Sequence, residues 1–290
     1  MNPKMTSDEV KVIGGRNNFW LWKKKTGFDL THPPTPDSPP IYPRITLETR
    51  ADKAAIDPAK TALVVIDMQN YFLSPLLGRP PKSIGLGIVD KLVSEVIPVC
   101  RTAGIPVVWL GWGVEDSDLD DIPPSIARGY DFPLDENFVK PTYLGSIGAE
   151  IGHVKADDGT DIDAGRVMMS DQWNTEFYPS LKEIAEPQDL HINKNRLSGF
   201  WGGSGIEEAL RNRGIRTLLF AGENTDQCVA GTIRDAYTKG WDCLMLSDAC
   251  ATTSPAFAKK CTEYNCEGGW GFVLSCKDLA DGVDAIDRGV

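Results

Sequence analysis

The chain has 290 residues, of which 41% are apolar and 24% charged, a composition typical of globular domains with ample material for a core. Its 41 acidic and 30 basic residues leave a net charge of -11, and the absence of a polybasic run excludes nucleic acid and anionic membranes as favoured partners. No apolar run approaches the roughly 18 residues that span a bilayer, and no secretory signal layout is present. Seven cysteines, an odd number, favour free thiols in a reducing compartment. We therefore expect a cytoplasmic protein.

Residues 1–44 differ in composition from the rest of the chain. They contain Trp20 and Trp22, three consecutive lysines, and six prolines between Pro33 and Pro43. Proline blocks helix continuation and strand pairing, so this segment is expected to be an extended N-terminal arm, with one domain over residues 45–290. The two tryptophans need apolar cover, on this subunit or on a neighbour. The arm therefore favours a homo-oligomer, a dimer or tetramer.

From Lys60 onward, short apolar runs alternate with amphipathic segments. Continuous apolar runs of this length are typical of parallel strands covered on both faces. The alternation predicts an α/β fold with three layers, α/β/α, around a six-stranded, mostly parallel sheet of order 3-2-1-4-5-6. The long stretch from Val114 to Gln172 reads as irregular and is expected to form an active-site rim or an oligomer loop. The predicted strands are 61–68, 106–112, 189–193, 217–222, 243–248 and 271–275, and the predicted helices are 87–103, 178–184, 206–213, 229–239 and 256–264.

Three residues with side chains suited to catalysis lie at the ends of predicted strands. Asp67 closes the first, Lys194 follows the third, and Cys228 follows the fourth at the start of a helix. Open parallel sheets bind ligands beyond the carboxyl ends of their strands, so these side chains should converge as an acid/base and nucleophile set. The first turn of a helix favours an anion, so the thiolate of Cys228 should form readily. The alternatives are a capping Asp67, a solvated Lys194 and a Cys228 that acts as a small hydrophobe.

Three motifs occur along the chain in an order and spacing typical of one known family: ALVVIDMQN, KNRLSGF and AGENTDQCV. Over residues 58–280 the chain resembles the isochorismatase-like cysteine hydrolase superfamily, which includes nicotinamidases, N-carbamoylsarcosine amidases and ureidoacrylate hydrolases. The resemblance implies a catalytic triad of Asp67, Lys194 and Cys228. It also implies a cis peptide between Glu223 and Asn224 and an oxyanion hole formed by the backbone N–H groups of Asn224 and Cys228. Asn224 departs from the small apolar residue usual in the family.

We interpret the chain as a hydrolase of a carbon–nitrogen bond in a small amide, ureide or carbamoyl compound. Asp67 would take the thiol proton, Lys194 would favour the thiolate and hold Asp67 ionised, and Cys228 would form an acyl-enzyme. Two alternatives stay open. One is an isochorismatase, whose vinyl-ether hydrolysis needs the acid but not the nucleophile; the other is a catalytically silent binding protein.

Five residues near the strand ends are candidates for contacts with the substrate. They are Gln69, Phe72, Trp112, Trp173 and Phe200. Aromatic side chains of this kind commonly form the walls of an apolar pocket.

We expect neither a metal nor another cofactor. Nicotinamidases carry histidines a few residues after the aspartate, whereas Met68, Gln69, Asn70 and Tyr71 follow it here. The chain has three histidines in all, far apart in the sequence, and no close pair of cysteines with the spacing of a zinc site.

Overall fold

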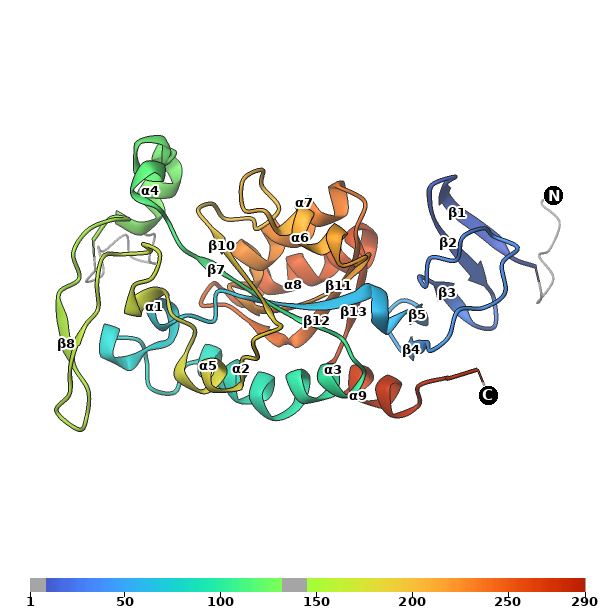
Figure 1. The fold of residues 1–290 in the computed structure, drawn as a ribbon, viewed down its shortest axis with the longest axis horizontal. Helices are drawn as coiled ribbons and strands as arrows, with labels where there is room; N and C mark the ends of the chain where they lie inside the picture. The colour runs from blue at the N-terminus through green and yellow to red at the C-terminus, as the bar shows by residue number, and fades with distance from the viewer. Residues whose placement is uncertain (1–8, 132–144, 290) are drawn as a thin grey trace.

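A six-stranded parallel sheet forms the centre of the computed structural model, which describes residues 9–131 and 145–289 (Figure 1). Each neighbouring pair of strands in it is parallel. Its order is β10-β7-β6-β11-β12-β13, which is the predicted 3-2-1-4-5-6 when these strands are numbered along the chain. The strands are β6 (Thr61–Ile66), β7 (Val107–Trp112), β10 (Leu190–Lys194), β11 (Thr217–Glu223), β12 (Asp242–Ala251) and β13 (Phe272–Leu274).

Helices cover both faces of this sheet, as the three-layer prediction requires (Figure 1). Alternate residues of β6 point to opposite faces, and Val64 and Val65 accordingly belong to two separate buried clusters. One cluster includes α2 (Ile84–Lys91), η3 (Leu92–Val96), α3 (Ile97–Thr102), α5 (Pro179–Ile184) and α9 (Cys276–Asp284). The other includes α6 (Ile206–Asn212), η6 (Thr225–Val229), α7 (Ala230–Thr238) and η7 (Cys266–Trp270), with α8 (Ala256–Asn265) alongside.

The N-terminal segment corrects the prediction of an extended arm. A second sheet has the order β1-β2-β3-β5-β4, with β1 and β2 paired as an antiparallel hairpin. Burial alternates along β2, where Phe19 and Leu21 are buried, and this is the period-two pattern of a strand. The prolines do not interrupt the pairing because they lie between β3 and β4. The strands are β1 (Lys11–Gly15), β2 (Asn18–Lys23), β3 (Gly27–Asp29), β4 (Ile45–Leu47) and β5 (Ala54–Ile56); residues 1–8 of the predicted arm lie outside the described residues.

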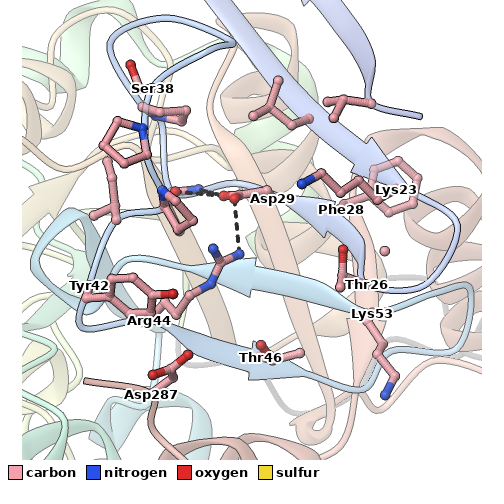
Figure 2. Close-up of a pocket in the computed structure, with 18 of the residues that line it drawn as sticks. Lys23, Thr26, Phe28, Asp29, Ser38, Tyr42, Arg44, Thr46, Lys53 and Asp287 are labelled. Carbon is pink, nitrogen blue, oxygen red and sulfur yellow. Dashed lines mark hydrogen bonds and ion pairs between the residues drawn. The ribbon is translucent and has the colours of Figure 1, made fainter. Parts of the chain in front are cut away.

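The expected boundary at residue 45 therefore cuts through this second sheet. Its apolar cover comes from the same chain, since the Trp20 ring lies 5.5 Å from the Phe272 ring and 6.1 Å from that of Phe28. The proline-rich segment folds back over the sheet and encloses a cavity of about 460 Å³. Figure 2 shows Arg44 reaching Asp29 in this cavity, with Nη2 3.0 Å from Oδ2.

The stretch from Val114 to Gln172 has more regular structure than its sequence suggests. It contains η4 (Asp116–Asp121), α4 (Pro124–Asp131) and a hairpin of β8 (His153–Lys155) and β9 (Asp161–Asp163). Its ends are joined by a bridge between Val114 and Met169, and residues 132–144 lie outside the described residues. None of the helices in the described part of the chain has the length and apolar character needed to cross a membrane.

Candidate active site

Asp67 stands directly after β6 in a left-handed backbone conformation, with φ of 53°. Such a conformation is unfavourable for a side chain other than glycine and persists where the surroundings hold it. Its neighbour Gln69 supplies that support: Gln69 Nε2 donates to the Trp112 and Thr175 carbonyls at 2.7 and 2.6 Å. Gln69 Oε1 accepts from the Trp112 N–H at 2.9 Å. The turn after β6 is thus anchored to β7, and Asp67 is held in the interior, 1% exposed.

Lys194, the last residue of β10, is also 1% exposed. Its Nζ lies 3.0 Å from Asp67 Oδ2 and 3.5 Å from Cys228 Sγ. The same ammonium lies 4.1 Å from the centroid of the Trp112 ring, a cation–π distance. The three residues that the sequence placed after separate strands are therefore in mutual contact.

Cys228 is 6% exposed and lies in η6, a π-helical turn that begins at Thr225 and runs into α7. Burial raises the pKa of its thiol to about 12; the charge of Asp67 raises it as well, and Lys194 opposes them. The prediction of a readily formed thiolate is therefore wrong for the resting site. Removal from water outweighs the helix start and the neighbouring ammonium.

Burial also raises the pKa of Asp67, and the positive charge of Lys194 is the main opposing effect. Lys194 Nζ lies 3.0 Å from Oδ2, and its charge lowers the pKa of Asp67 more than each of the hydrogen bonds from Cys228, Lys194 and Trp112 does. The contact is therefore chiefly electrostatic. A buried carboxylate that is hydrogen-bonded to a protonated thiol is well placed to accept that proton.

The peptide between Glu223 and Asn224 is cis, as the resemblance implied. Just before it, Gly222 has φ of 121°, and a Cβ there would lie 2.1 Å from the Ile66 carbonyl oxygen. A glycine is thus required where β11 passes β6 next to Asp67. The Asn224 side chain accepts from the Thr253 N–H at 3.2 Å, which directs it toward the segment after β12.

A cavity of about 910 Å³ opens beside the thiol. Glu223, Asn224 and Cys228 line it, and so do two of the five predicted substrate contacts, Phe72 and Trp112. The other three are not among the residues that line it, which corrects their predicted role. They are Gln69, Phe200 and Trp173. The Gln69 amide is hydrogen-bonded to backbone carbonyl groups. Phe200 is 2% exposed and packs on Trp241, and Trp173 packs against the buried cluster on one sheet face.

Two further residues of the cavity were missed in the sequence. Tyr130 on α4 lies against the Trp112 ring at 5.5 Å, and burial raises its pKa well above the usual value. Arg79 stacks over the Tyr71 ring at 4.9 Å and donates from Nε to the Tyr71 carbonyl at 2.7 Å. The helical spacing of Ile126 and Tyr130 was the available signal for the first; a lone arginine between turn residues gave none for the second.

No group of three or more His, Cys, Asp or Glu side chains that could hold a metal ion occurs within residues 9–131 and 145–289.

The fold and site together define a class: a doubly wound α/β protein whose thiol, ammonium and carboxylate meet at the carboxyl ends of its strands, an arrangement suited to nucleophilic catalysis. The family model of the isochorismatase domain matches residues 61–264, well over half of the chain. The chain therefore belongs to the isochorismatase family, and the resemblance drawn from its motifs is confirmed.

Among curated relatives, the ureidoacrylate amidohydrolase RutB of Caulobacter segnis is 30% identical over 253 residues, covering 86% of this chain and 95% of the relative. RutB of Pseudomonas savastanoi pv. phaseolicola is 30% identical over 250 residues, covering 84% and 91%. Solved structures with a similar fold include a cysteine hydrolase from Pseudomonas syringae pv. phaseolicola, with a TM-score of 0.59 at 18% identity over 79% of this chain and 95% of that one. N-carbamoylsarcosine amidase from Thermoplasma acidophilum gives a TM-score of 0.53 at 23% identity, over 75% and 96%.

Proposed function

We propose that the protein is an amidohydrolase that cleaves a carbon–nitrogen bond of a small amide, ureide or carbamoyl compound through an acyl-enzyme on Cys228. The observation that carries this proposal is the position of Lys194 Nζ, 3.0 Å from Asp67 Oδ2 and 3.5 Å from Cys228 Sγ, at the wall of a cavity of about 910 Å³. Hydrolysis of a carbon–nitrogen bond outside peptides is the activity that the ureidoacrylate amidohydrolase relatives support.

The reaction begins from the protonated thiol. Sγ attacks the carbonyl carbon of the substrate while its proton passes to Asp67, so that the buried thiolate never has to exist by itself. The oxygen that becomes negative is stabilised by the backbone N–H groups of Asn224 and Cys228. When the carbon–nitrogen bond breaks, Asp67 returns the proton to the leaving nitrogen and a thioester remains. Water, deprotonated by Asp67, then hydrolyses the thioester and restores the thiol.

Lys194 has two effects in this sequence. Its positive charge opposes the burial that raises the pKa of Asp67, and so keeps the carboxylate able to act as a base. It also lies close enough to Sγ to favour negative charge on sulfur during the attack.

The test compares wild type with Cys228→Ala and Cys228→Ser in an ammonia-release screen over nicotinamide, ureido acids, carbamoyl amino acids and aryl amides, with isochorismate in parallel. We expect release from at least one compound with a carbon–nitrogen bond, a loss in either variant to below about a hundredth of the wild-type kcat, and a mass increase on Cys228 when the reaction is stopped early. Turnover of isochorismate that survives Cys228→Ala would favour vinyl-ether hydrolysis. A thiol no more reactive than the other six, with no turnover, would favour a binding protein.

We also propose that the protein is cytoplasmic. All seven of its cysteines are free thiols, and six of them are buried. This arrangement suits a reducing compartment.

A further inference from the structure

The mechanism leaves the buried carboxyl group of Glu223 unused. Glu223, at the end of β11, lines the cavity and is 5% exposed. Its Oε1 is buried without a hydrogen-bond partner. An unpaired buried carboxyl oxygen is costly, so beside a cavity it takes its partner from whatever fills the cavity: water in the free protein and a polar group of the ligand in the complex.

The surroundings of Glu223 are shaped to admit its carboxyl group. A Cβ on Gly85 of α2 would lie 2.5 Å from Glu223 Oε2 and 2.6 Å from Leu73 Cδ2. A side chain at position 85 would therefore displace the ends of the Glu223 and Leu73 side chains. Gly85 and Arg79 line the cavity next to Glu223, so the carboxyl and a guanidinium belong to the same wall.

The charge state of Glu223 indicates which partner suits it. Burial raises its pKa to about 8; the charge of Asp67 raises it further, whereas Arg79 opposes both. At neutral pH the group is therefore mostly a neutral carboxylic acid, with one oxygen that accepts and one O–H that donates. A neutral amide or ureide offers the complementary N–H and C=O, whereas a cation would require ionisation of a carboxyl that burial and Asp67 keep protonated.

We propose that Glu223 is a specificity-determining residue that selects substrates bearing a second neutral amide or ureide group beyond the scissile carbonyl. This proposal deepens the proposed amidohydrolase function and rests on the same cavity. The second group donates its N–H to Oε1, the atom that is otherwise without a partner.

The test uses matched probes on a protein that cannot turn them over. With the Cys228→Ala protein, Kd is measured calorimetrically for the diamides from malonamide to adipamide and for analogues in which a methyl ketone replaces one terminal amide. The two members of a pair have nearly the same shape, and the ketone lacks the N–H donors of one terminal group and has a weaker carbonyl acceptor there. We expect at least one diamide to bind about tenfold more tightly than its ketone partner, the effect of one good hydrogen bond to a buried group. The ω-ammonium amides of the same lengths should bind no better than the ketones.

Further variants in the same background separate recognition from structure. Glu223→Gln keeps a neutral acceptor and donor and should retain the preference, while Glu223→Leu should abolish it. Gly85→Ala, which pushes the carboxyl out of its space, should abolish it without altering Glu223 itself. Gln227→Leu, a change at an exposed polar residue of the same cavity, should leave it intact.

The proposal is overturned if no diamide is preferred, if the ammonium compounds bind best and Glu223→Gln loses them, or if Gln227→Leu removes the preference as fully as Glu223→Leu. These results are independent of turnover. A preference for diamides together with no hydrolysis of any compound in the ammonia-release screen would refute the amidohydrolase function and leave the recognition site standing. Hydrolysis in that screen without a preference for diamides would do the reverse.

Discussion

Asp242, at the start of β12, is one of the points at which the N-terminal sheet is joined to the main one. Its buried carboxylate accepts from Trp20 Nε1 at 2.7 Å and from Thr217 Oγ1 at 3.0 Å, and His32 Nε2 lies 2.6 Å from it. Trp20→Phe removes one donor but keeps an aromatic ring between Phe28 and Phe272. A hydrogen bond to a charged group contributes about 1.5–3 kcal/mol, so this change should lower the free energy of unfolding by about that amount.

Asp242→Asn should lower the free energy of unfolding by more, about 3–5 kcal/mol. The new amide N–H₂ group would face one of the donors that now bind a carboxylate oxygen, and that donor would lose its acceptor. In a double-mutant cycle the two losses should not add, and a coupling of about 1–2 kcal/mol is expected from residues that share one contact. The assay is urea unfolding followed by circular dichroism. Trp22→Phe is the matched control, because Trp22 Nε1 donates at 3.0 Å to Asp52, next to β5 of the N-terminal sheet, and its loss should show no coupling to Asp242→Asn. Costs below about 0.5 kcal/mol at Trp20 and Asp242, the range of ordinary surface changes, would refute this account of the junction.

Three further predictions concern the site and the assembly. Lys194→Met removes the charge that opposes burial of Asp67, so the acidic limb of the kcat/KM profile should move to higher pH and kcat should fall at neutral pH; an unmoved limb would show that Asp67 is not the base. Because burial raises the pKa of Glu223 from 4.5 to about 8, the folded protein retains a proton that the unfolded chain releases, and stability falls as pH rises through that window. Glu223→Gln should therefore be increasingly stabilising from about pH 4.5 to 8, by a few kcal/mol at most, and an equal effect at pH 4 and pH 9 in urea unfolding would contradict this. We propose that the protein is a homo-oligomer, so light scattering should give two or four times 31.7 kDa, and Trp20→Phe should not change that mass because Trp20 is covered within its own chain; a mass of one chain would refute the assembly.

The main sheet could be predicted because its strands are short, continuous apolar runs, a pattern typical of strands that are buried on both faces. A strand that is covered on both faces needs an uninterrupted apolar run, so it can be recognised in the sequence without knowing which strands it pairs with. The N-terminal strands are short and partly exposed, and a proline-rich stretch follows β3, so composition masked the alternation around Phe19 and Leu21. Pairing of β3 with β5, across residues 30–53, is a long-range contact that no local pattern encodes.

The site divides in the same way. Asp67, Lys194 and Cys228 could be found because polar residues that end apolar strands meet at one edge of a parallel sheet. The state of the thiol was mispredicted because the start of a helix is visible in sequence, whereas the desolvation that raises its pKa depends on side chains from the whole fold. The buried position of Glu223 depends likewise on the space left at Gly85, on another element.

β1 and the segment after α9 lie on the same side of the molecule in Figure 1, near the amino ends of the main strands. The cavity with Cys228 lies at the carboxyl ends, where Asp67 and Lys194 close β6 and β10. A linker attached at β1 or at the segment after α9 would therefore leave the substrate entrance facing the solution. A bead or fusion partner attached there would contact the N-terminal sheet and α9, and would leave diffusion into the cavity unobstructed.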